Sequence, residues 1–533
     1  MARTKRPNIV YIYADDLGHG MLSCYGQRHY RTPNIDRIAD DGARFNRAYG
    51  TAFCAPARAC LLRGQHDAHA GRWTFCLGGI YNRHTDGQYS LDEVAELVHN
   101  TGITPGPDDP HLARLARQAG YTTAQIGKLE WGFATTADQL QRNGWDYHYG
   151  YYDHLQCHGF YPPYVFDNGR KVPIDGNTRD DFGVGPHHMF PEGTNEHDPA
   201  GRAVYSQDLF DQAIVRFLRD HRDQPFFLYH PSQLPHGPIY FPDLDPQVAD
   251  NPDLTPVEKE YASMVLRLDR TVGLVLDQLD ALGLAQNTLV IFASDNGHHL
   301  YYNQPGRSQG HLTLDGQPID NHHTAFTTQT CGDVFDGNGG LAGLKTTNWE
   351  GGCRIPMLVR WPAAIQAGQI SEQLVSNYDT MATLAEALGI APPDDTDGLS
   401  YLPALTGRHD APEHDHVVYA SQFGPCLVTR DRWKLRVWLR PEAILDYSTF
   451  GQPLAELADA FEAQLYNLAD DPTEQHDLAA DRPELAGELK RRLLAECDGN
   501  FVHGTPQAHF AFYPEPDHYL WPTDKAPEPS PRQ

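Results

Sequence analysis

The chain has little positive charge for its size. Its 533 residues include 42 lysines and arginines against 70 aspartates and glutamates, which gives a formal net charge of -28 at pH 7. Nucleic acids and anionic membranes are bound through basic surfaces, so the composition argues against both as partners. An anionic substrate would have to be attracted by a local group of cations. Lysine is especially scarce, with eight lysines against 34 arginines.

Long apolar runs are also absent. No stretch is long enough to span a bilayer, and the basic start Met1–Arg6 is not followed by the apolar core region of a signal peptide. A transmembrane helix or a secretory signal peptide would need such a segment. The sequence therefore predicts a cytoplasmic protein with no membrane contact. A periplasmic protein whose signal peptide had been removed would have the same start.

Paired cysteines are lacking as well. The nine cysteines are an odd number and are scattered along the chain. They have neither the spacing of a disulfide framework nor that of a zinc site. The cysteines therefore suggest neither a disulfide framework nor a cysteine-bound zinc site.

Buried strands alternate with helical segments over most of the chain. Continuous apolar runs of strand length are typical of a parallel sheet that is buried on both faces. The runs of strand length are 9–14, 121–126, 225–230, 289–293 and 357–362, and the helical segments include 110–118, 203–219, 257–282 and 378–388. This pattern predicts an α/β fold with a mostly parallel sheet.

The pattern changes after residue 407. Residues 417–419, 427–429 and 433–437 alternate like antiparallel strands, and 483–496 reads as a closing helix. The length of the chain also favours more than one domain. We predict a large domain over 1–408 and a smaller one with an antiparallel sheet over 409–533.

Oxygen-bearing side chains follow two of the buried strands. Asp15 and Asp16 come after the first strand, and Asp295 and Asn296 come after 289–293. In open α/β sheets, ligands bind at the carboxyl ends of strands, and adjacent carboxylates repel one another unless they share a cation. An all-oxygen set suits Ca²⁺, with Mg²⁺ as the alternative, and does not suit zinc. A solvated turn is the other interpretation of the acidic pair.

Two cationic or titratable side chains stand at further strand ends. Lys128 follows the strand 121–126. Because the chain has so few lysines, a lysine at this strand end suggests a need for a compact ammonium group. His236 lies between two prolines after the strand 225–230. Its ordinary pKa near neutrality suits a general acid.

Cys54 and Arg58 lie one helical turn apart. Proline is common in the first turn of a helix, so Pro56 predicts that Cys54 lies at a helix N-terminus. The unpaired N–H groups there favour an anion or a thiolate. Arg58 would project from the same face of the helix. A half-buried cysteine in an ordinary helix is the alternative.

The segment 54–64 resembles the signature of the type I sulfatases, Cys-x-Pro-x-Arg-x-x-Leu-x-x-Gly. Further family motifs occur in the family's order between about Pro7 and Leu478. They are Gly127-Lys128, 235–238 (Pro-His-x-Pro), 343–356 (Gly-x-Lys to Glu-Gly-Gly-x-Arg-x-Pro), the junction 397–407 and 465–474. The ordered set is far more specific than any single motif.

Two positions depart from the family pattern. Arg63 stands where the signature usually has threonine, and Glu130 stands where most members have the histidine of Gly-Lys-x-His. A subset of the family lacks that histidine and has a later His-rich segment before Tyr-Pro, which residues 156–162 resemble. We therefore interpret His158 as its substitute and place His158 and Glu130 on the substrate-binding side of the site.

The resemblance implies an alkaline-phosphatase-like fold, with a large mixed, mainly parallel sheet between helices and a smaller C-terminal domain. It also implies that a formylglycine-generating enzyme oxidises Cys54 to Cα-formylglycine, whose hydrate attacks the sulfur. The implied catalytic residues are Cys54, Arg58, Lys128, His236 and Lys345, and the implied metal ligands are Asp15, Asp16, Asp295, Asn296 and residue 54.

Several substrates fit this expectation. Polar insertions at 165–200 and 298–340, rich in histidine and tyrosine, suggest a sulfated carbohydrate. An aryl sulfate and a phosphonate or phosphate diester are alternatives for the same site geometry. A glycan-binding protein without catalytic activity is the alternative from another functional class, because Glu130 replaces the motif histidine.

Overall fold

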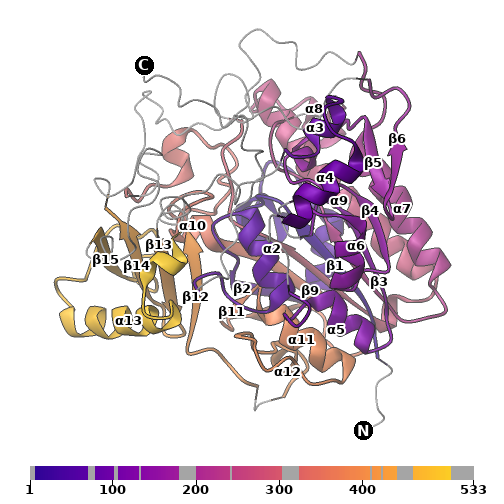
Figure 1. Cartoon of the computed structure of the whole chain (residues 1–533). Helices are drawn as coiled ribbons and strands as arrows, with labels where there is room; N and C mark the ends of the chain where they lie inside the picture. Colours follow the sequence, from indigo (N-terminus) through magenta and orange to yellow (C-terminus); the bar gives the residue numbers. More distant parts are fainter. Residues whose placement is uncertain are drawn as a thin grey trace.

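The structure is a computed structural model of the whole chain. It describes residues 6–69, 79–100, 106–130, 134–178, 200–239, 243–302, 323–408, 411–421, 424–440 and 460–505. Within these residues the strands form two sheets, one of eleven strands and one of four. Figure 1 shows the large sheet surrounded by helices and the small sheet beside it.

The large sheet is mixed: its central strands are parallel, antiparallel pairs lie on both sides of them, and the short strands at one edge are again parallel to their neighbour. Its strands run in the order β10-β2-β9-β8-β1-β7-β3-β4-β5-β6, and β11 pairs with β2. They are β1 Asn8–Ala14, β2 Ala43–Tyr49, β3 Thr122–Gly127, β4 Tyr147–Gly150, β5 Tyr164–Asp167, β6 Arg170–Pro173, β7 Phe226–Pro231, β8 Thr288–Ser294, β9 Arg354–Arg360, β10 Gln369–Ser371 and β11 Val375–Ser376. β1 lies between β7 and β8 and is parallel to both. The predicted α/β architecture is confirmed.

Two groups of helices cover the large sheet. α1 (Pro33–Asp40), α7 (Ser206–Asp220) and α9 (Pro256–Ala281) form one group, in which α9 contacts the other two. α2 (Cys54–Arg63), α5 (Leu112–Gln118) and α11 (Asp379–Leu388) contact one another in the second group, which lies in front of the sheet in Figure 1. The shorter helices include α3 Asn82–Thr85, α4 Leu91–Asn100, α6 Ala137–Asn143, α8 Pro246–Ala249, α10 Glu350–Cys353 and α12 Leu402–Leu405.

The first part of the expected insertion at 165–200 is a hairpin. β5 and β6 pair with each other and extend the large sheet beyond β4. Asn168 and Gly169 form the turn and have positive φ angles of 45° and 88°. This is the conformation that Asn-Gly adopts readily in two-residue hairpins. Residues 179–199 of the expected insertion lie outside the described residues.

The small sheet is antiparallel. Its strands are β12 His416–Ser421, β13 Gly424–Thr429, β14 Trp433–Leu439 and β15 Phe461–Asn467, and α13 (Pro483–Glu496) packs against β13, β14 and β15. The change from the large sheet to the small one falls between α12 and β12. The exact division of the chain at residue 408 stays a prediction.

The two sheets share a buried core instead of meeting at a polar surface. One apolar cluster combines Tyr49 and Trp349 from the large-sheet side with Tyr419 and Val428 from the small sheet. The loop that contains Trp349 is bonded to β14, since Arg436 donates to Asn348 Oδ1 at 2.8 Å and Asn348 donates to the Val437 carbonyl at 3.0 Å. The small sheet therefore supports a loop of the large one.

A buried ion-pair group reinforces this junction. Lys434 Nζ on β14 lies 3.1 Å from Glu350 Oε1 and 2.7 Å from Glu474 Oε1, and all three side chains are buried. Burial would lower the pKa of Lys434, but the two glutamates raise it, so the lysine stays charged. Glu350 Oε2 also lies 3.8 Å from Arg354 Nη1.

Replacing Lys434 with methionine should lower the free energy of unfolding by ~3–5 kcal/mol, because it leaves two buried carboxylates without their cation. Urea unfolding followed by circular dichroism would measure the loss. Arg492→Met is the matched control, since Arg492 pairs with Glu488 at the surface and such pairs contribute less than about 1 kcal/mol. Equal stability of the two variants would contradict the importance of the buried group.

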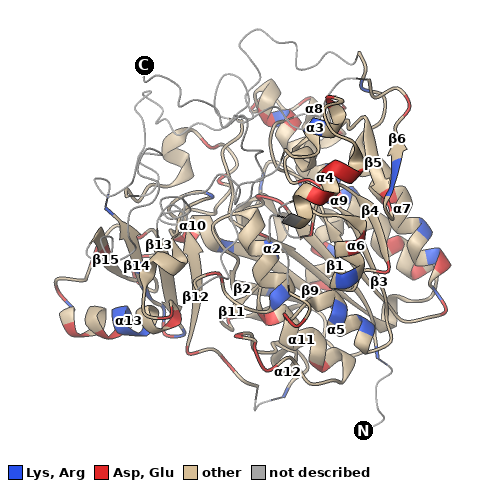
Figure 2. Ribbon diagram, viewed as in Figure 1, with Lys and Arg blue, Asp and Glu red and all other residues tan. Residues whose placement is uncertain are grey.

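Charged residues are spread over the outer helices. Figure 2 shows acidic and basic residues interspersed along α7 and α13. Among the described residues, no helix combines the length and the apolar character that crossing a membrane requires. The eight cysteines in the described part of the chain are all free thiols.

Candidate active site

The ends of β1 and β8 bring the predicted oxygen ligands together. The two strands are in register from Asn8 with Thr288 to Ala14 with Ser294, so Asp15 and Asp295 follow side by side. Asp16 has a positive φ of 60°, and its N–H donates to Asp295 Oδ1 at 3.0 Å. Asn296 donates to Asp16 Oδ1 at 2.8 Å. One oxygen from each of the three aspartates lies within 4.8 Å of the others.

This group of oxygens fits a divalent cation. Asp15, Asp16, Asp295 and Asn296 are all fully buried. Asp15 Oδ1 and Asn296 Oδ1 accept no hydrogen bond, which is costly for buried oxygens unless a cation completes their environment. Oxygen ligands of this kind suit Ca²⁺ or Mg²⁺. The residues present can therefore hold such an ion.

The carboxylates differ in their electrostatic surroundings. Burial and the neighbouring Asp15 raise the pKa of Asp295 to about 8. Burial would also raise the pKa of Asp16, but Lys345 and His236 lower it well below its ordinary value. A divalent cation among the three groups would favour the ionised form of each.

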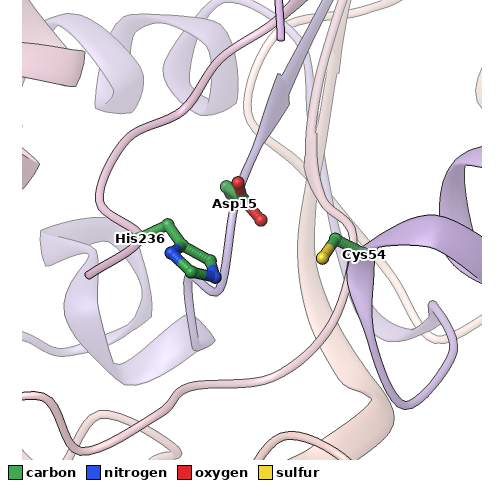
Figure 3. Close-up of side chains that lie close together, drawn as sticks. All are labelled: Asp15, Cys54 and His236. Carbon is green, nitrogen blue, oxygen red and sulfur yellow. The ribbon is translucent and has the colours of Figure 1, made fainter. Parts of the chain in front are cut away.

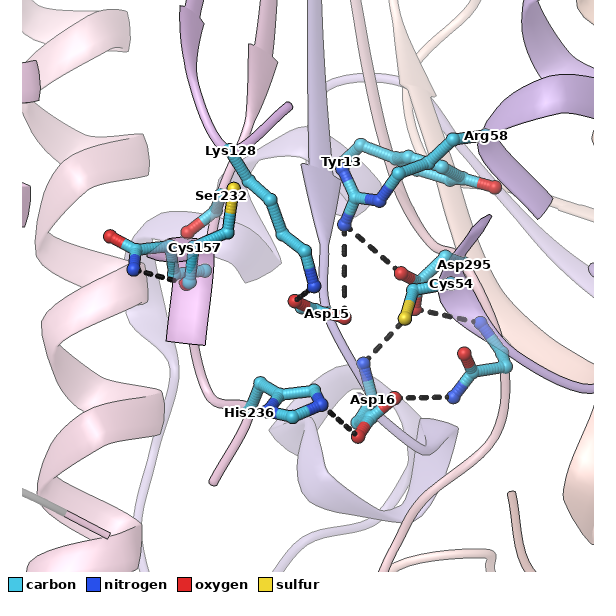
Figure 4. Close-up of polar contacts among 12 residues, drawn as sticks. Tyr13, Asp15, Asp16, Cys54, Arg58, Lys128, Cys157, Ser232, His236 and Asp295 are labelled. Atoms are coloured by element: carbon cyan, nitrogen blue, oxygen red, sulfur yellow. Dashed lines mark hydrogen bonds and ion pairs between the residues drawn. The ribbon is translucent and has the colours of Figure 1, made fainter. Parts of the chain in front are cut away.

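Three buried cations surround the carboxylates, and Figure 4 shows two of them, Lys128 and Arg58. Lys128 Nζ, at the end of β3, lies 2.5 Å from Asp15 Oδ2, and Lys345 Nζ lies 2.7 Å from Asp16 Oδ2. Arg58 Nη2 lies 3.0 Å from Asp295 Oδ2 and 3.7 Å from Asp15 Oδ1. These cations balance the acidic residues and can also attract the oxygens of an anionic substrate.

Cys54 is the first residue of α2, as predicted. The preceding Phe53 is extended, and Pro56 lies in the first turn of the helix. Figure 3 shows Cys54 and His236 on either side of Asp15, and one ligand atom of each residue lies within 4.8 Å of the others. Cys54 is buried, and burial raises the pKa of its thiol. Arg58 follows one turn later, and its guanidinium carbon lies 5.4 Å from the ring centroid of Tyr13.

His236 is held in one tautomer by its neighbours. Its Nδ1 donates to the Gly237 carbonyl, so Nε2 accepts from Lys345 Nζ at 3.0 Å. Burial and Lys345 lower the pKa of His236 to about 3. The ring is therefore neutral near pH 7, and the proton between these two residues resides on Lys345.

Two histidines of the segment 153–158 reach the site. His158 Nε2 lies 3.2 Å from Lys128 Nζ, and its ring stacks on His236 with centroids 4.2 Å apart. His158 thus lies beside two predicted site residues, and its role as the substitute for the motif histidine stays a prediction. His154 was not identified from the sequence, although its Nε2 is 3.8 Å from Cys54 Sγ. The four-residue spacing between His154 and His158 is the feature of the sequence that could have identified it.

Glu130 lies elsewhere. Its carboxylate accepts from Asn143 Nδ2 at 2.7 Å and from Trp145 Nε1, and it is 3.3 Å from His111 Nε2. Glu130 is only 1% exposed. Its oxygens are thus engaged in a buried network behind β3, which corrects the expectation that this residue faces the substrate.

The segment after Asn296 is more buried than expected. His298, His299, Tyr301 and Tyr302 belong to the polar insertion predicted at 298–340, yet all four are buried. The Tyr301 hydroxyl donates to Asp16 Oδ2, so this tyrosine belongs to the site and was missed by the sequence analysis. Residues 303–322 of the predicted insertion lie outside the described part of the chain.

Comparisons with known proteins agree with this geometry. The family model described as Sulfatase matches residues 7–390. The N-acetylgalactosamine-6-O-sulfatase of Bacteroides thetaiotaomicron is 28% identical over 92% of this chain and 93% of its own. The N-acetylgalactosamine-6-sulfatase of Canis lupus familiaris is 32% identical over 81% of this chain and 72% of its own. A solved structure from work on the metabolism of multiple glycosaminoglycans by Bacteroides thetaiotaomicron has a TM-score of 0.67 at 25% identity, covering 93% of this chain and all of that one.

Proposed function

The chain belongs to the sulfatase family and is a hydrolase of sulfate esters, and from this premise we propose that its substrate is a carbohydrate sulfate, with N-acetylgalactosamine 6-sulfate as the foremost candidate. The observation that carries the proposal is the position of Cys54. It begins a helix directly opposite buried strand-end carboxylates and two buried lysines. The substrate class is supported by the names of the two relatives.

Two groups complete this site when they are bound or formed. Cα-formylglycine in place of Cys54 supplies the nucleophilic oxygen, and a divalent cation held by Asp15, Asp16, Asp295 and Asn296 acidifies that oxygen and neutralises charge. We propose Ca²⁺ as the ion, because the ligand set contains only oxygens from protein side chains. Chelation should therefore abolish activity, and Ca²⁺ should restore it.

The residues of the chain itself provide positioning and charge. Lys128 and Lys345 have their ammonium groups on either side of the acidic cluster and would bind the sulfate oxygens as negative charge gathers on them. Arg58 lies one turn after residue 54 on α2 and pairs with Asp295, which ties the first part of the helix to the acidic cluster.

We assign the proton for the leaving oxygen to Lys345. The sequence analysis gave this role to His236, but the neutral His236 ring accepts a hydrogen bond from Lys345 at the relevant nitrogen. His236 would orient the ammonium by accepting one of its hydrogen bonds, while another ammonium proton passes to the leaving oxygen and Lys345 becomes a neutral amine.

A rate comparison tests the substrate. The chain is expressed with a formylglycine-generating enzyme and assayed on N-acetylgalactosamine 6-sulfate, nitrophenyl sulfate, a phosphate diester and a phosphonate. We expect the highest kcat/KM on the sugar sulfate. Preference for nitrophenyl sulfate would identify an arylsulfatase, and preference for a phosphorus ester would overturn the sulfate assignment. No turnover by a fully converted chain would favour the glycan-binding pseudoenzyme.

His154 should act as a positioning residue for residue 54. Replacing it with alanine removes the histidine nitrogen that lies 3.8 Å from Cys54 Sγ and should lower kcat by ~10²-fold with little change in KM. His154→Gln should recover part of the loss, because its amide can reach a similar position. Steady-state kinetics would measure both. Equal losses in the two variants would indicate a purely structural role.

A further inference from the structure

A second cluster of possible metal ligands lies away from the active site. His66 and His69 follow α2, and Asp397 follows α11; one ligand atom of each lies within 4.8 Å of the other two. His69 Nε2 is 3.1 Å from Asp397 Oδ2, and His66 Nε2 is 3.8 Å from the same oxygen. Glu496, the last residue of α13, adds Oε2 at 3.4 Å from His66 Nε2.

These separations match a tetrahedral metal site. Zinc bonds nitrogen and oxygen ligands at about 2.0–2.2 Å, so neighbouring ligand atoms in a tetrahedron lie about 3.3 Å apart. The separations from Asp397 Oδ2 to His69 Nε2 and to His66 Nε2, 3.1 and 3.8 Å, lie on either side of that value. Two imidazoles and a carboxylate also suit zinc better than calcium.

The outer contacts of the cluster resemble those that orient metal ligands. His69 Nδ1, on the far side of its ring, lies 3.4 Å from Asp498 Oδ2. The second oxygen of Glu496 lies 2.9 Å from His416 Nε2. Ligating histidines commonly have such a carboxylate on their other nitrogen, which fixes the tautomer and strengthens the ligand.

The charges favour a bound cation over ion pairs alone. The rings of His66 and His69 stack with centroids 3.9 Å apart, and His66 is 3% exposed, so two protonated rings would repel each other strongly there. Yet Asp397 and Glu496 form ion pairs only with histidines in the described part of the chain. A divalent cation between two neutral rings would satisfy both carboxylates without that repulsion. Glu496 also stands at a helix C-terminus, where a cation is favoured.

We propose that His66, His69 and Asp397 bind a zinc ion, or a divalent transition metal with a similar ligand preference, beside Glu496 at the end of α13. Asp498 orients His69. The site is separate from the all-oxygen group at the ends of β1 and β8, and it does not depend on the substrate of the enzyme.

Zinc titration of the untagged full chain tests the proposal. Calorimetry is performed in millimolar Ca²⁺ and in a Cys54→Ala background, so that neither the oxygen cluster nor the active-site thiol takes up zinc. We expect one equivalent of Zn²⁺ to bind. His69→Gln should abolish this binding, and Asp498→Asn should weaken it about 10-fold. His476→Gln is the matched control, because His476 pairs with Asp471 at the surface.

Two further measurements locate the ion. Co²⁺ should give the visible absorption of a four-coordinate site in the parent chain and not in His69→Gln. Zinc should slow amide hydrogen exchange at the C-terminal end of α13. No zinc uptake, or uptake unchanged by both His69→Gln and Asp498→Asn, would overturn the proposal. Since Asp498→Asn keeps all three ligands, it remains informative if His69→Gln does not fold.

Discussion

Replacing Cys54 with alanine should lower kcat/KM on a sulfate ester by at least ~10⁴-fold. Alanine cannot be converted to formylglycine, and it leaves no nucleophile at the start of α2 opposite Asp15 and His236. Initial rates on N-acetylgalactosamine 6-sulfate or nitrophenyl sulfate would measure the loss. The mass of the peptide that contains residue 54 would show how much of the parent chain is converted.

Cys60→Ala is the matched control for this variant. Cys60 is another buried cysteine of α2, 2% exposed, and it lies in the apolar core shared by the two sheets. Its replacement should leave kcat/KM within a few fold of the parent, about what a small repacking costs. Comparable activity of Cys54→Ala and Cys60→Ala would contradict the role of residue 54.

The Cys54→Ser variant separates the two halves of the reaction. A serine hydroxyl could attack the sulfur, but it lacks the second oxygen needed to expel sulfate from the enzyme. We expect at most one turnover, followed by a chain with sulfate covalently bound at residue 54. Repeated turnover by this variant would count against the formylglycine mechanism.

Lys345→Met should lower kcat by ~10²–10³-fold, because it removes a buried ammonium where transition-state charge develops. The Lys345 Nζ is 2.7 Å from Asp16 and 3.0 Å from His236, so its position is well defined. Methionine keeps much of the side-chain volume and removes the charge and the proton. Steady-state kinetics and thermal unfolding of both proteins would separate lost chemistry from lost stability.

The pH profile gives a second check on Lys345. Burial would lower its pKa, but Asp16 raises it above the ordinary lysine value. The ammonium is therefore retained as pH rises, and it is lost only well above pH 10. Any decline of kcat between pH 7 and 9 should come from another group and should persist in the residual activity of Lys345→Met.

Lys490→Met is the control for the loss of a lysine. Lys490 is exposed on α13, and its removal should leave kcat unchanged. A similar decrease in both variants would mean that net charge, and not the position of Lys345, controls the rate.

The central strands and the site residues that follow them could be predicted from the sequence. β1, β7 and β8 are buried on both faces, so their apolar runs are continuous and easily recognised. The polar residues after them must lie at one sheet edge. β2 was missed because it alternates buried and half-buried residues over only a few positions, with arginines among them.

The side chains on loops were harder to predict. Tyr301 and His154 reach the site from irregular segments whose direction no periodic pattern indicates. Glu130 shows the same difficulty in reverse, since it lies two residues after Lys128 in sequence but turns into a pocket formed by His111, Asn143 and Trp145. Proximity in the motif did not determine where the carboxylate points.

The bond between Asn348 and Arg436 has a consequence for shortened versions of this enzyme. The stretch that carries Lys345 is anchored from the far side by β14, through Asn348, the ring of Trp349 and the Lys434 ion pairs. A chain ending near residue 408 would keep every motif of the catalytic centre. It would nevertheless remove the β14 contacts that hold the segment around Lys345. The C-terminal portion is therefore needed to position a catalytic lysine, and its deletion should cost activity.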